Sequence, residues 1–175
     1  MFKKYWKFFV IFWSVVLVGI IGVFVFFWLI SAGKLGFMPT FEELENPNNR
    51  FASEVYFADG PIMNRYFEKE NRKYIEYREI PQSVIDALIA TEDVRFYDHS
   101  GVDVRGLFRV AKGLLTANPS AGGGSTISQQ LAKMLFPRES DLNVFELAIR
   151  KFREWVIAVR LEKSYTKEEI LTMYL

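Results

Sequence analysis

The 175-residue chain contains no cysteine and a single histidine. The absence of cysteine excludes disulfide bonds, thiolate catalysis and zinc–thiolate sites, and one histidine cannot supply a multi-histidine metal centre. Any metal would therefore need oxygen ligands. A strong net charge is also missing, because 22 basic and 21 acidic residues leave a formal charge of +1. The composition thus favours neither a nucleic-acid-binding nor a strongly acidic class of protein.

Charged residues are absent from one long stretch near the N-terminus, residues 8–33. The roughly 23 residues from Phe8 to Ile30 would cover about 35 Å as a helix, enough to cross the hydrocarbon core of a membrane. Three lysines precede this span and only Lys34 follows it closely, so the positive-inside rule places residues 1–7 in the cytoplasm and the rest outside. A cleaved signal peptide is the alternative, but the apolar run is longer than usual and no clear A-x-A site follows it.

The next segment, residues 31–80, is expected to link the membrane span to a folded domain. Residues 34–50 contain two prolines, three glutamates and three asparagines, a composition typical of a solvated spacer. Asp59 and Gly60 then stand between two strand-like runs, SEVYF and IMNRYF. This arrangement predicts a small β-hairpin connector outside the membrane.

From Pro81 onward the apolar spacing becomes helical, which predicts a mainly α-helical domain over residues 81–175. A first helix begins near Pro81, a residue suited to a first turn. Thr166 and Glu169 are predicted to form a capping box for the last helix. Because the sequence stops inside that helical pattern, we expect residues 81–175 to be the N-terminal part of a longer domain. The other helices are predicted at about 102–117, 127–136 and 142–163.

Two adjacent acids, Glu92 and Asp93, stand at the end of the first helix. Apolar residues precede Glu92 by seven, four and three positions, so a continuous helix places Glu92 on an apolar face. A carboxylate held against apolar surface holds its proton more tightly, which suits a general acid or base. The alternative is an ordinary glutamate at the rim of the helix end, with Asp93 facing water. The three apolar residues that precede Glu92 on the predicted apolar face are Ile85, Leu88 and Ile89.

Phe96, His99 and Gly101 follow within the same turn. Phe96 suits a core position as well as the lining of a cleft. His99 suits a hydrogen-bonding role that holds the turn for Gly101, and the alternative is a catalytic role.

A glycine-rich stretch, residues 122–124, leads through Ser125 and Thr126 into the helix predicted at 127–136. Thr126 and Gln129 are predicted to form a capping box. Such a loop presents backbone N–H groups and the positive end of the helix dipole, which suit phosphate or pyrophosphate, and Lys133 adds a cation. It is not a Walker loop, because no Gly-Lys-Ser/Thr follows. A flexible loop with a good helix cap explains the pattern equally well.

The helix predicted at 142–163 carries charged residues beside an apolar stripe. Arg150 and Lys151 precede Glu154 by four and three residues, which is usually a solvated ion-pair face. The alternative is that Arg150 and Lys151 form a cationic binding site for a polyanionic substrate. Glu154 would then orient these two cations or bind a metal. The stripe that we expect to be buried consists of Phe145, Ile149, Phe152, Val156 and Val159.

These stretches occur together in one order: E-D-x-x-F-x-x-H-x-G at 92–101, G-G-S-T-I-S-Q-Q at 123–130, R-K-x-x-E at 150–154 and K-x-x-I-L-x-x-Y-L at 167–175. In combination they resemble the peptidoglycan glycosyltransferase domain, glycosyltransferase family 51, of class A penicillin-binding proteins and monofunctional transglycosylases. The resemblance covers about residues 81–175. The chain departs from the family's usual threonine and glutamate at two positions, Ser128 and Thr172.

The resemblance implies a lysozyme-like fold and polymerisation of lipid II into β-1,4-linked glycan, with release of undecaprenyl pyrophosphate. Glu92 is then the expected general base, Asp93 assists it, and Glu154 orients the cations or binds a divalent metal such as Mg²⁺ or Mn²⁺. No organic cofactor is expected. The residues expected to bind substrate are Phe96, His99, Gly123, Ser125, Thr126, Gln129, Gln130, Lys133, Arg150 and Lys151.

The resemblance further implies a bacterial plasma-membrane protein whose partners are lipid II, the growing glycan strand, the membrane and other cell-wall synthesis proteins, and not nucleic acid. Two other classes stay open. One is a hydrolase of lysozyme type with Glu92 and Glu154 as its carboxylate pair, although neutral glycan would need no cationic loop. The other is a non-catalytic membrane-anchored fragment. Whichever class holds, we expect the chain ending at Leu175 to polymerise poorly by itself.

Overall fold

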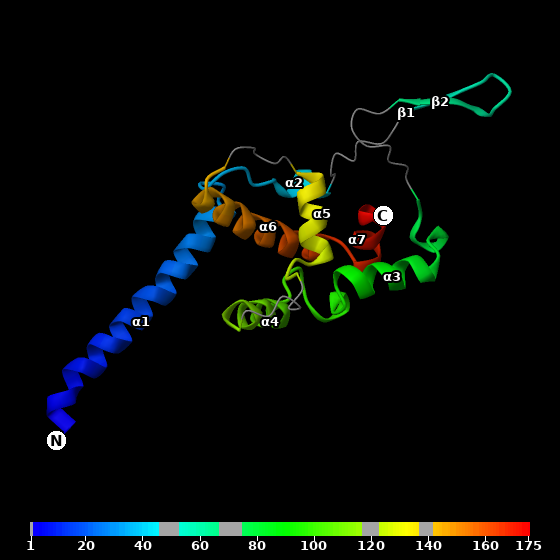
Figure 1. Cartoon of the computed structure of the whole chain (residues 1–175). Helices are drawn as coiled ribbons and strands as arrows, with labels where there is room; N and C mark the ends of the chain where they lie inside the picture. Colours follow the sequence, from blue (N-terminus) through cyan, green and yellow to red (C-terminus); the bar gives the residue numbers. More distant parts are fainter. Residues whose placement is uncertain (1, 46–52, 67–74, 117–122, 137–141) are drawn as a thin grey trace. The chain divides into compact units, whose positions relative to one another are not determined.

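The structure of the chain is a computed structural model, shown in Figure 1. It describes residues 2–45, 53–66, 75–116, 123–136 and 142–175. The chain divides into two compact units. The first contains Met1–Met38 and Asp141–Val156, and the second contains Pro39–Ser140 and Ile157–Leu175.

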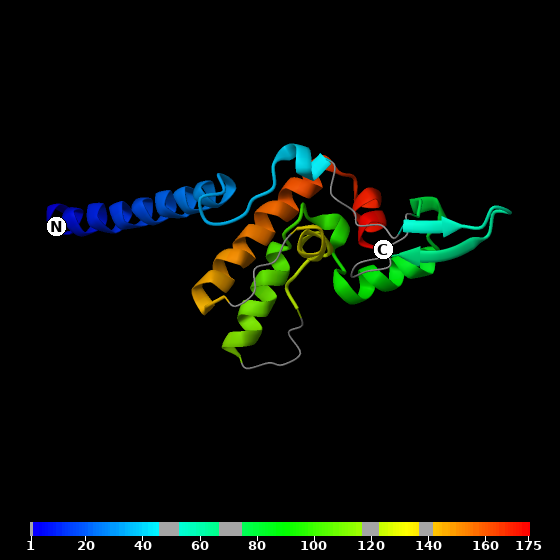
Figure 2. The same ribbon diagram turned by 90° about the horizontal axis from the view of Figure 1, so that it is seen from above.

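The first unit is dominated by the helix α1 (Phe2–Ser31), which Figure 2 shows as one uninterrupted helix. Its segment Tyr5–Ser31 is long and apolar enough to cross a membrane, with a mean hydropathy of 2.8. The predicted N-terminal apolar helix is therefore confirmed. It begins before the predicted Phe8, because the lysines near its start are good helix formers and do not interrupt the backbone hydrogen bonds.

The other part of the first unit is the N-terminal portion of α6 (Val144–Ser164). The Phe152 ring meets Phe26 and Phe27 edge-on, with ring centroids 5.3 Å and 5.7 Å apart. Such aromatic pairs add stabilisation beyond the area they bury. They join this part of α6 to the C-terminal end of α1.

The buried stripe predicted for α6 is wrong. Phe145 is 71% exposed, and the other four predicted residues are only half-buried. Two neighbouring charged residues, Arg153 and Glu154, are buried instead. The buried face of α6 is turned by about one residue relative to the predicted stripe. The apolar residues on the buried face are Ile157, Ala158 and Leu161.

The second unit contains the remaining helices, and their positions confirm the mainly α-helical prediction. Each of the predicted helices begins within a few residues of the expected position. Thr166 and Glu169 form the predicted capping box, since each side chain accepts a hydrogen bond from the backbone N–H of the other. The helices are α3 (Gln82–Glu92), α4 (Val104–Leu115), α5 (Ile127–Leu135) and α7 (Lys167–Tyr174), with the short 3₁₀ helices η1 (Tyr77–Glu79) and η2 (Phe96–Asp98).

One further helix, α2 (Phe41–Glu45), lies in the segment that was expected to be a solvated spacer. Thr40 and Glu43 cap its start through reciprocal hydrogen bonds, and Leu44 is fully buried. Tyr165 donates a hydrogen bond to the Leu44 carbonyl at 2.5 Å, which fixes α2 to the end of α6. The spacer prediction is therefore wrong for residues 41–45, while residues 46–50 lie outside the described part of the chain.

The predicted hairpin is present as β1 (Ser53–Tyr56) and β2 (Ile62–Tyr66), paired antiparallel (Figure 1). Gly60 in its turn has a φ of +105°, a conformation that glycine adopts without steric cost. The register shifts between Val55 and Tyr56. Among the described residues, these two strands pair only with each other.

The core of the second unit surrounds α5. Three apolar residues of α5 are buried, and α7 packs against both α5 and η1. Phe96 is fully buried, a placement worth about 1.5–3 kcal/mol for a side chain of this kind. The Lys167 Nζ lies 4.2 Å from the centre of the Phe96 ring and donates to the His99 carbonyl at 2.7 Å. The buried α5 residues are Ile127, Leu131 and Ala132.

Candidate active site

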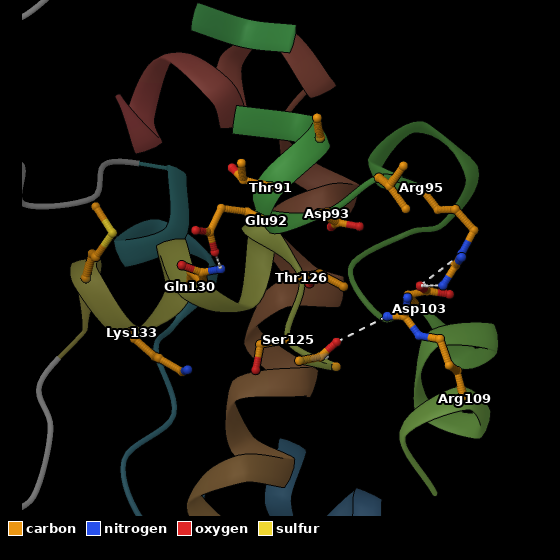
Figure 3. A pocket seen from close by; sticks show the side chains of 15 residues that line it. Thr91, Glu92, Asp93, Arg95, Asp103, Arg109, Ser125, Thr126, Gln130 and Lys133 are labelled. Carbon is orange, nitrogen blue, oxygen red and sulfur yellow. Dashed lines mark hydrogen bonds and ion pairs between the residues drawn. The ribbon is translucent and has the colours of Figure 1, made fainter. Parts of the chain in front are cut away.

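An open cavity of about 780 Å³ lies within the second unit. Three segments form it: the end of α3 with the following turn, the start of α4, and the glycine-rich loop with α5. Figure 3 shows Glu92, Gln130 and Lys133 along one side and Arg95, Asp103 and Arg109 along the other, with Ser125 and Thr126 between them. The remaining lining residues are Ala90, Thr91, Asp93, Val94, Gly123, Gly124 and Met134.

Glu92, the last residue of α3, is exposed in this cavity. Its Oε2 accepts a hydrogen bond of 2.6 Å from Gln130 Nε2 (Figure 3). The expected apolar setting of Glu92 is therefore wrong, because Ile85 is the only buried residue of α3 and the helix ends before another turn could cover Glu92. What the position provides instead is a carboxylate that faces the cavity and is oriented by an amide.

Asp93 occupies the buried position that the pattern assigned to its neighbour. The chain leaves the helical conformation at Asp93, with φ −158° and ψ 75°, so its side chain turns inward. Asp93 Oδ2 accepts a hydrogen bond of 3.1 Å from the Ile127 backbone N–H, at the first position of α5. A carboxylate at a helix N-terminus is also favoured by the helix dipole.

His99 is the second partner of Asp93. Its Nε2 lies 3.1 Å from Asp93 Oδ1 and 3.0 Å from Oδ2, and both side chains are almost completely buried. Buried carboxylates need such partners, because an unpaired one would pay a large desolvation cost. Asp93 and His99 therefore connect the turn after α3 to the start of α5.

The start of α5 is capped differently from the prediction. Thr126 Oγ1 accepts from the Gln129 N–H at 3.2 Å, as in a capping box. The Gln129 side chain does not return to Thr126, because its Nε2 donates to the Gly101 carbonyl at 3.2 Å. The N–H groups of Ile127 and Gln129 are thus already bonded within the protein, while the predicted binding of phosphate by the loop stays a prediction. The helix dipole still favours an anion at this end of α5.

Gly101 is held where no other residue fits. Its φ is +93°, and a Cβ built on it would lie 2.7 Å from the backbone carbonyl carbon of Ala158 in α6. Besides Gln129, the Thr126 hydroxyl donates to the Gly101 carbonyl, at 2.7 Å. This close approach fixes the turn after η2 between α5 and α6.

Basic side chains lie on both sides of the cavity. Lys133 projects from α5, and Arg109 of α4 donates to the Gly123 carbonyl at 3.3 Å (Figure 3). Arg95 instead pairs with Asp103 through hydrogen bonds of 3.1 Å and 2.5 Å. Partial burial works to raise the pKa of Asp103, but the hydrogen bonds from Arg95 and from the Gly106 N–H outweigh it and lower that pKa. The cavity thus offers cations opposite and beside the Glu92 carboxylate.

The structure brings two of the predicted motifs together in this cavity. Seven of the predicted site residues line it, namely Glu92, Asp93, Gly123, Ser125, Thr126, Gln130 and Lys133. Three others, Phe96, His99 and Gln129, do not line it, and their contacts connect η2, α5 and the turn between η2 and α4. Arg150, Lys151 and Glu154 belong to the first unit, where Lys151 Nζ lies 3.2 Å from Glu154 Oε2. Their predicted roles remain predictions.

Three charged residues and one tyrosine of the site were missed by the sequence reasoning. Arg95, Asp103 and Arg109 line the cavity, and Tyr174 donates a hydrogen bond of 3.0 Å to Gln130 Oε1. Tyr174 lies in the fourth motif, which was the available signal for it. No pattern in one sequence would have shown that Arg95 and Asp103 pair across eight residues.

The structure offers no support for a metal site at Glu154. Its carboxylate pairs with Lys151, and the described part of the chain contains no cluster of three or more His, Cys, Asp or Glu side chains arranged to hold a metal ion. The divalent cation therefore remains a prediction.

A family comparison identifies the class of protein. The model of the Transglycosylase family matches residues 59–175, so the chain belongs to the Transglycosylase family. The match includes the second strand of the hairpin as well as the helices that form the cavity.

Individual relatives point to one kind of family member. Penicillin-binding protein 1A of Escherichia coli (strain K12) is 38% identical over 138 residues, which cover 79% of this chain and 16% of the relative. The protein of the same name from Haemophilus influenzae is 38% identical over 147 residues, or 84% of this chain and 16% of the relative. That from Neisseria flavescens is 35% identical over 137 residues, or 78% and 16%. The chain thus spans about a sixth of the length of these relatives.

Proposed function

We propose that the chain is the membrane-anchored part of a peptidoglycan glycosyltransferase that polymerises lipid II into β-1,4-linked glycan strands. Undecaprenyl pyrophosphate is the leaving group. The observation that carries the proposal is that Glu92 and two cations, Lys133 and Arg109, face one open cavity. Membership of the Transglycosylase family and the similarity to proteins named penicillin-binding protein 1A support it.

Glu92 acts as the general base in this proposal. The 4-hydroxyl of the acceptor's N-acetylglucosamine attacks C1 of the N-acetylmuramic acid at the lipid-linked end of the growing chain, with inversion at C1. Glu92 removes the hydroxyl proton during the attack, a contribution typically worth about 10²–10⁴-fold in rate. Its exposure in the cavity supports this role, because a base must reach the substrate.

Lys133 and Arg109 offset the charge of the departing pyrophosphate. As the C1–O bond breaks, negative charge grows on the leaving oxygen, and fixed cations stabilise that charge more in the transition state than in the bound substrate. Both residues line the cavity that also contains Glu92. Arg95 has a different role, because its guanidinium is bonded to Asp103 and stiffens the cavity wall.

A lipid-linked substrate agrees with the outer surface of α4. Its residues Val104, Phe108 and Leu115 are 58%, 74% and 89% exposed, and their spacing places them on one face. Basic residues lie beside them at helical spacing, namely Arg105, Arg109 and Lys112. An exposed apolar stripe flanked by basic residues is typical of a helix that lies in a membrane interface. Arg109 therefore belongs both to the cavity and to a surface suited to lipid.

The proposed location is the bacterial plasma membrane, with α1 crossing it once, residues 1–7 in the cytoplasm and the second unit outside. The length and hydropathy of α1 support a membrane span. The lysines ahead of it support the orientation. A domain held at the bilayer reaches a lipid-linked sugar directly.

Product analysis tests the proposed function against the hydrolase alternative. The complete product of the reading frame that contains these 175 residues is incubated with labelled lipid II in one reaction and with finished glycan strands in another. A glycosyltransferase converts lipid II into long glycan and leaves the finished strands intact. Fragments released from finished glycan, with no polymer from lipid II, would show that the site is hydrolytic. Inactivity on both substrates would support a non-catalytic membrane-anchored protein.

A further inference from the structure

A chain of two hydrogen bonds connects α7 to the proposed base. The Tyr174 hydroxyl donates to Gln130 Oε1 at 3.0 Å, and Gln130 Nε2 donates to Glu92 Oε2 at 2.6 Å. The three residues come from α7, α5 and α3, all within the second unit. The Gln130 amide thus joins Tyr174, which is 44 positions away in sequence, to Glu92, which is 38 positions away.

The direction of each hydrogen bond follows from the chemistry of the groups. An ionised carboxylate only accepts hydrogen bonds, so Gln130 must turn its NH₂ group toward Glu92. The amide oxygen then faces Tyr174, whose hydroxyl must donate. Burial, and after it the negative charge of Glu92, raise the pKa of Tyr174, so the hydroxyl keeps its proton at neutral pH. Each bond therefore fixes the orientation that the other one needs.

We infer that Gln130 and Tyr174 are positioning residues, which hold the Glu92 carboxylate in the orientation that accepts the substrate proton. This inference rests on the proposed function. Gln130 occupies Oε2, so the proton transfer uses the other oxygen, Oε1. Glu92 ends α3 and is exposed, so little apolar packing restrains its rotamers. A base that must lie within hydrogen-bond reach of a hydroxyl loses rate steeply when it can turn away.

Substitution of Gln130 should change the kinetics differently from substitution of a residue that binds substrate. A binding residue changes KM, whereas a residue that orients the base changes kcat. Tyr174 does not itself line the cavity, and it reaches the lining through its hydrogen bond to Gln130. Its removal should therefore act only through Gln130.

The test uses Tyr174→Phe, Gln130→Met and their combination in the complete product of the reading frame, with lipid II as substrate. The expected result is a fall in kcat of about tenfold for Tyr174→Phe and more for Gln130→Met, with KM changed by less than about twofold. The double variant should be no slower than Gln130→Met, because residues of one network are not additive. Tyr97→Phe is the matched control, since Tyr97 is 57% exposed and outside the cavity lining, and it should retain wild-type kcat.

Glu92→Gln, measured beside these variants, separates the network from the proposed function. Loss of polymerisation in Glu92→Gln together with wild-type kcat in Tyr174→Phe would overturn the network and leave the function standing. Full polymerisation by Glu92→Gln would overturn both. A higher KM with unchanged kcat in Gln130→Met would show substrate binding in place of positioning. Thermal unfolding midpoints confirm that each variant is folded, and an unfolded Gln130→Met leaves the Tyr174→Phe result decisive.

Discussion

The Asp93 carboxylate accepts a hydrogen bond from the Ile127 N–H, 3.1 Å away, and so joins the residue after α3 to the first residue of α5. Because Glu92 stands on one side of this bond and Thr126 on the other, it sets the position of the proposed base relative to the glycine-rich loop. His99 secures the same carboxylate from the turn that follows. Asp93 thereby acts as a structural centre of the site, although the resemblance assigned it a catalytic role.

Asp93→Ala is expected to destabilise the protein by roughly 2 kcal/mol or more, because it removes a buried acceptor and each buried donor left without a partner costs about 1–3 kcal/mol. The variant leaves His99 unpaired and the Ile127 N–H unsatisfied. Urea unfolding of the detergent-solubilised protein measures the change. Asp98→Ala is the control, because Asp98 is exposed, and its effect should stay within about 0.5 kcal/mol. Equal stability of the two variants would contradict the structural role.

Gly101→Ala is expected to destabilise the protein by roughly 2 kcal/mol or more, since strain at a positive φ adds to a clash. The new methyl group would lie 2.7 Å from the Ala158 carbonyl carbon. Gly123→Ala serves as the comparison, because a Cβ there meets nothing within 4 Å. Thermal unfolding of both variants checks the prediction. A Gly101→Ala protein that melts like Gly123→Ala would show that the turn can move away from α6.

The Arg95–Asp103 pair is expected to contribute stability that depends on pH. The folded-state pKa of Asp103 is below its ordinary value of 3.8, so the unfolded chain takes up its proton first as pH falls. The contribution is present above that ordinary value and is lost as pH drops below it toward the folded pKa. Asp103→Asn should therefore remove part of the acid-induced loss of stability below about pH 4. Parallel acid profiles for both proteins would contradict the assignment.

Much of the fold was predictable because the helices have strong local signals. Thr166 with Glu169 predicts its own capping box, and the apolar run of α1 is unambiguous in length. The site was less predictable where the backbone leaves regular geometry. Helical periodicity assigned Glu92 to the buried side, but the helix ends there, and Asp93, in a non-helical conformation, takes the buried position. A period of 3.6 residues carries no information beyond the residue at which the helix stops.

Contacts between distant segments account for the other differences. Gln129 satisfies the sequence rule for a capping box, yet its amide binds Gly101, a residue 28 positions earlier. Likewise, Tyr174 is a motif residue whose role depends on Gln130 in another helix. Local propensity is a weak guide at such positions, because tertiary hydrogen bonds outweigh the few tenths to about 1 kcal/mol involved in a local choice.

A single cysteine placed at residue 108 should report contact of α4 with lipid. The chain has no cysteine of its own, so Phe108→Cys can be labelled specifically with an environment-sensitive dye. The dye emission is expected to shift to the blue when the chain is reconstituted through α1 into vesicles with anionic lipid, because the α4 face lies in the interface. Glu168→Cys, at an exposed position of α7, should show a smaller shift. Equal shifts at both positions would contradict the proposed lipid-facing surface.

Polymerisation of lipid II by Glu92→Gln tests the central claim most directly. Glu92 is exposed and accepts one hydrogen bond from Gln130, so its replacement should change the free energy of unfolding by no more than about 0.5 kcal/mol. The glycan formed per minute should nevertheless fall by about 10²–10⁴-fold, the loss typical of a missing general base. The measurement compares labelled glycan from the wild-type and variant proteins at equal amounts of folded enzyme. Near-normal turnover by the folded variant would contradict the assignment of Glu92 as the base.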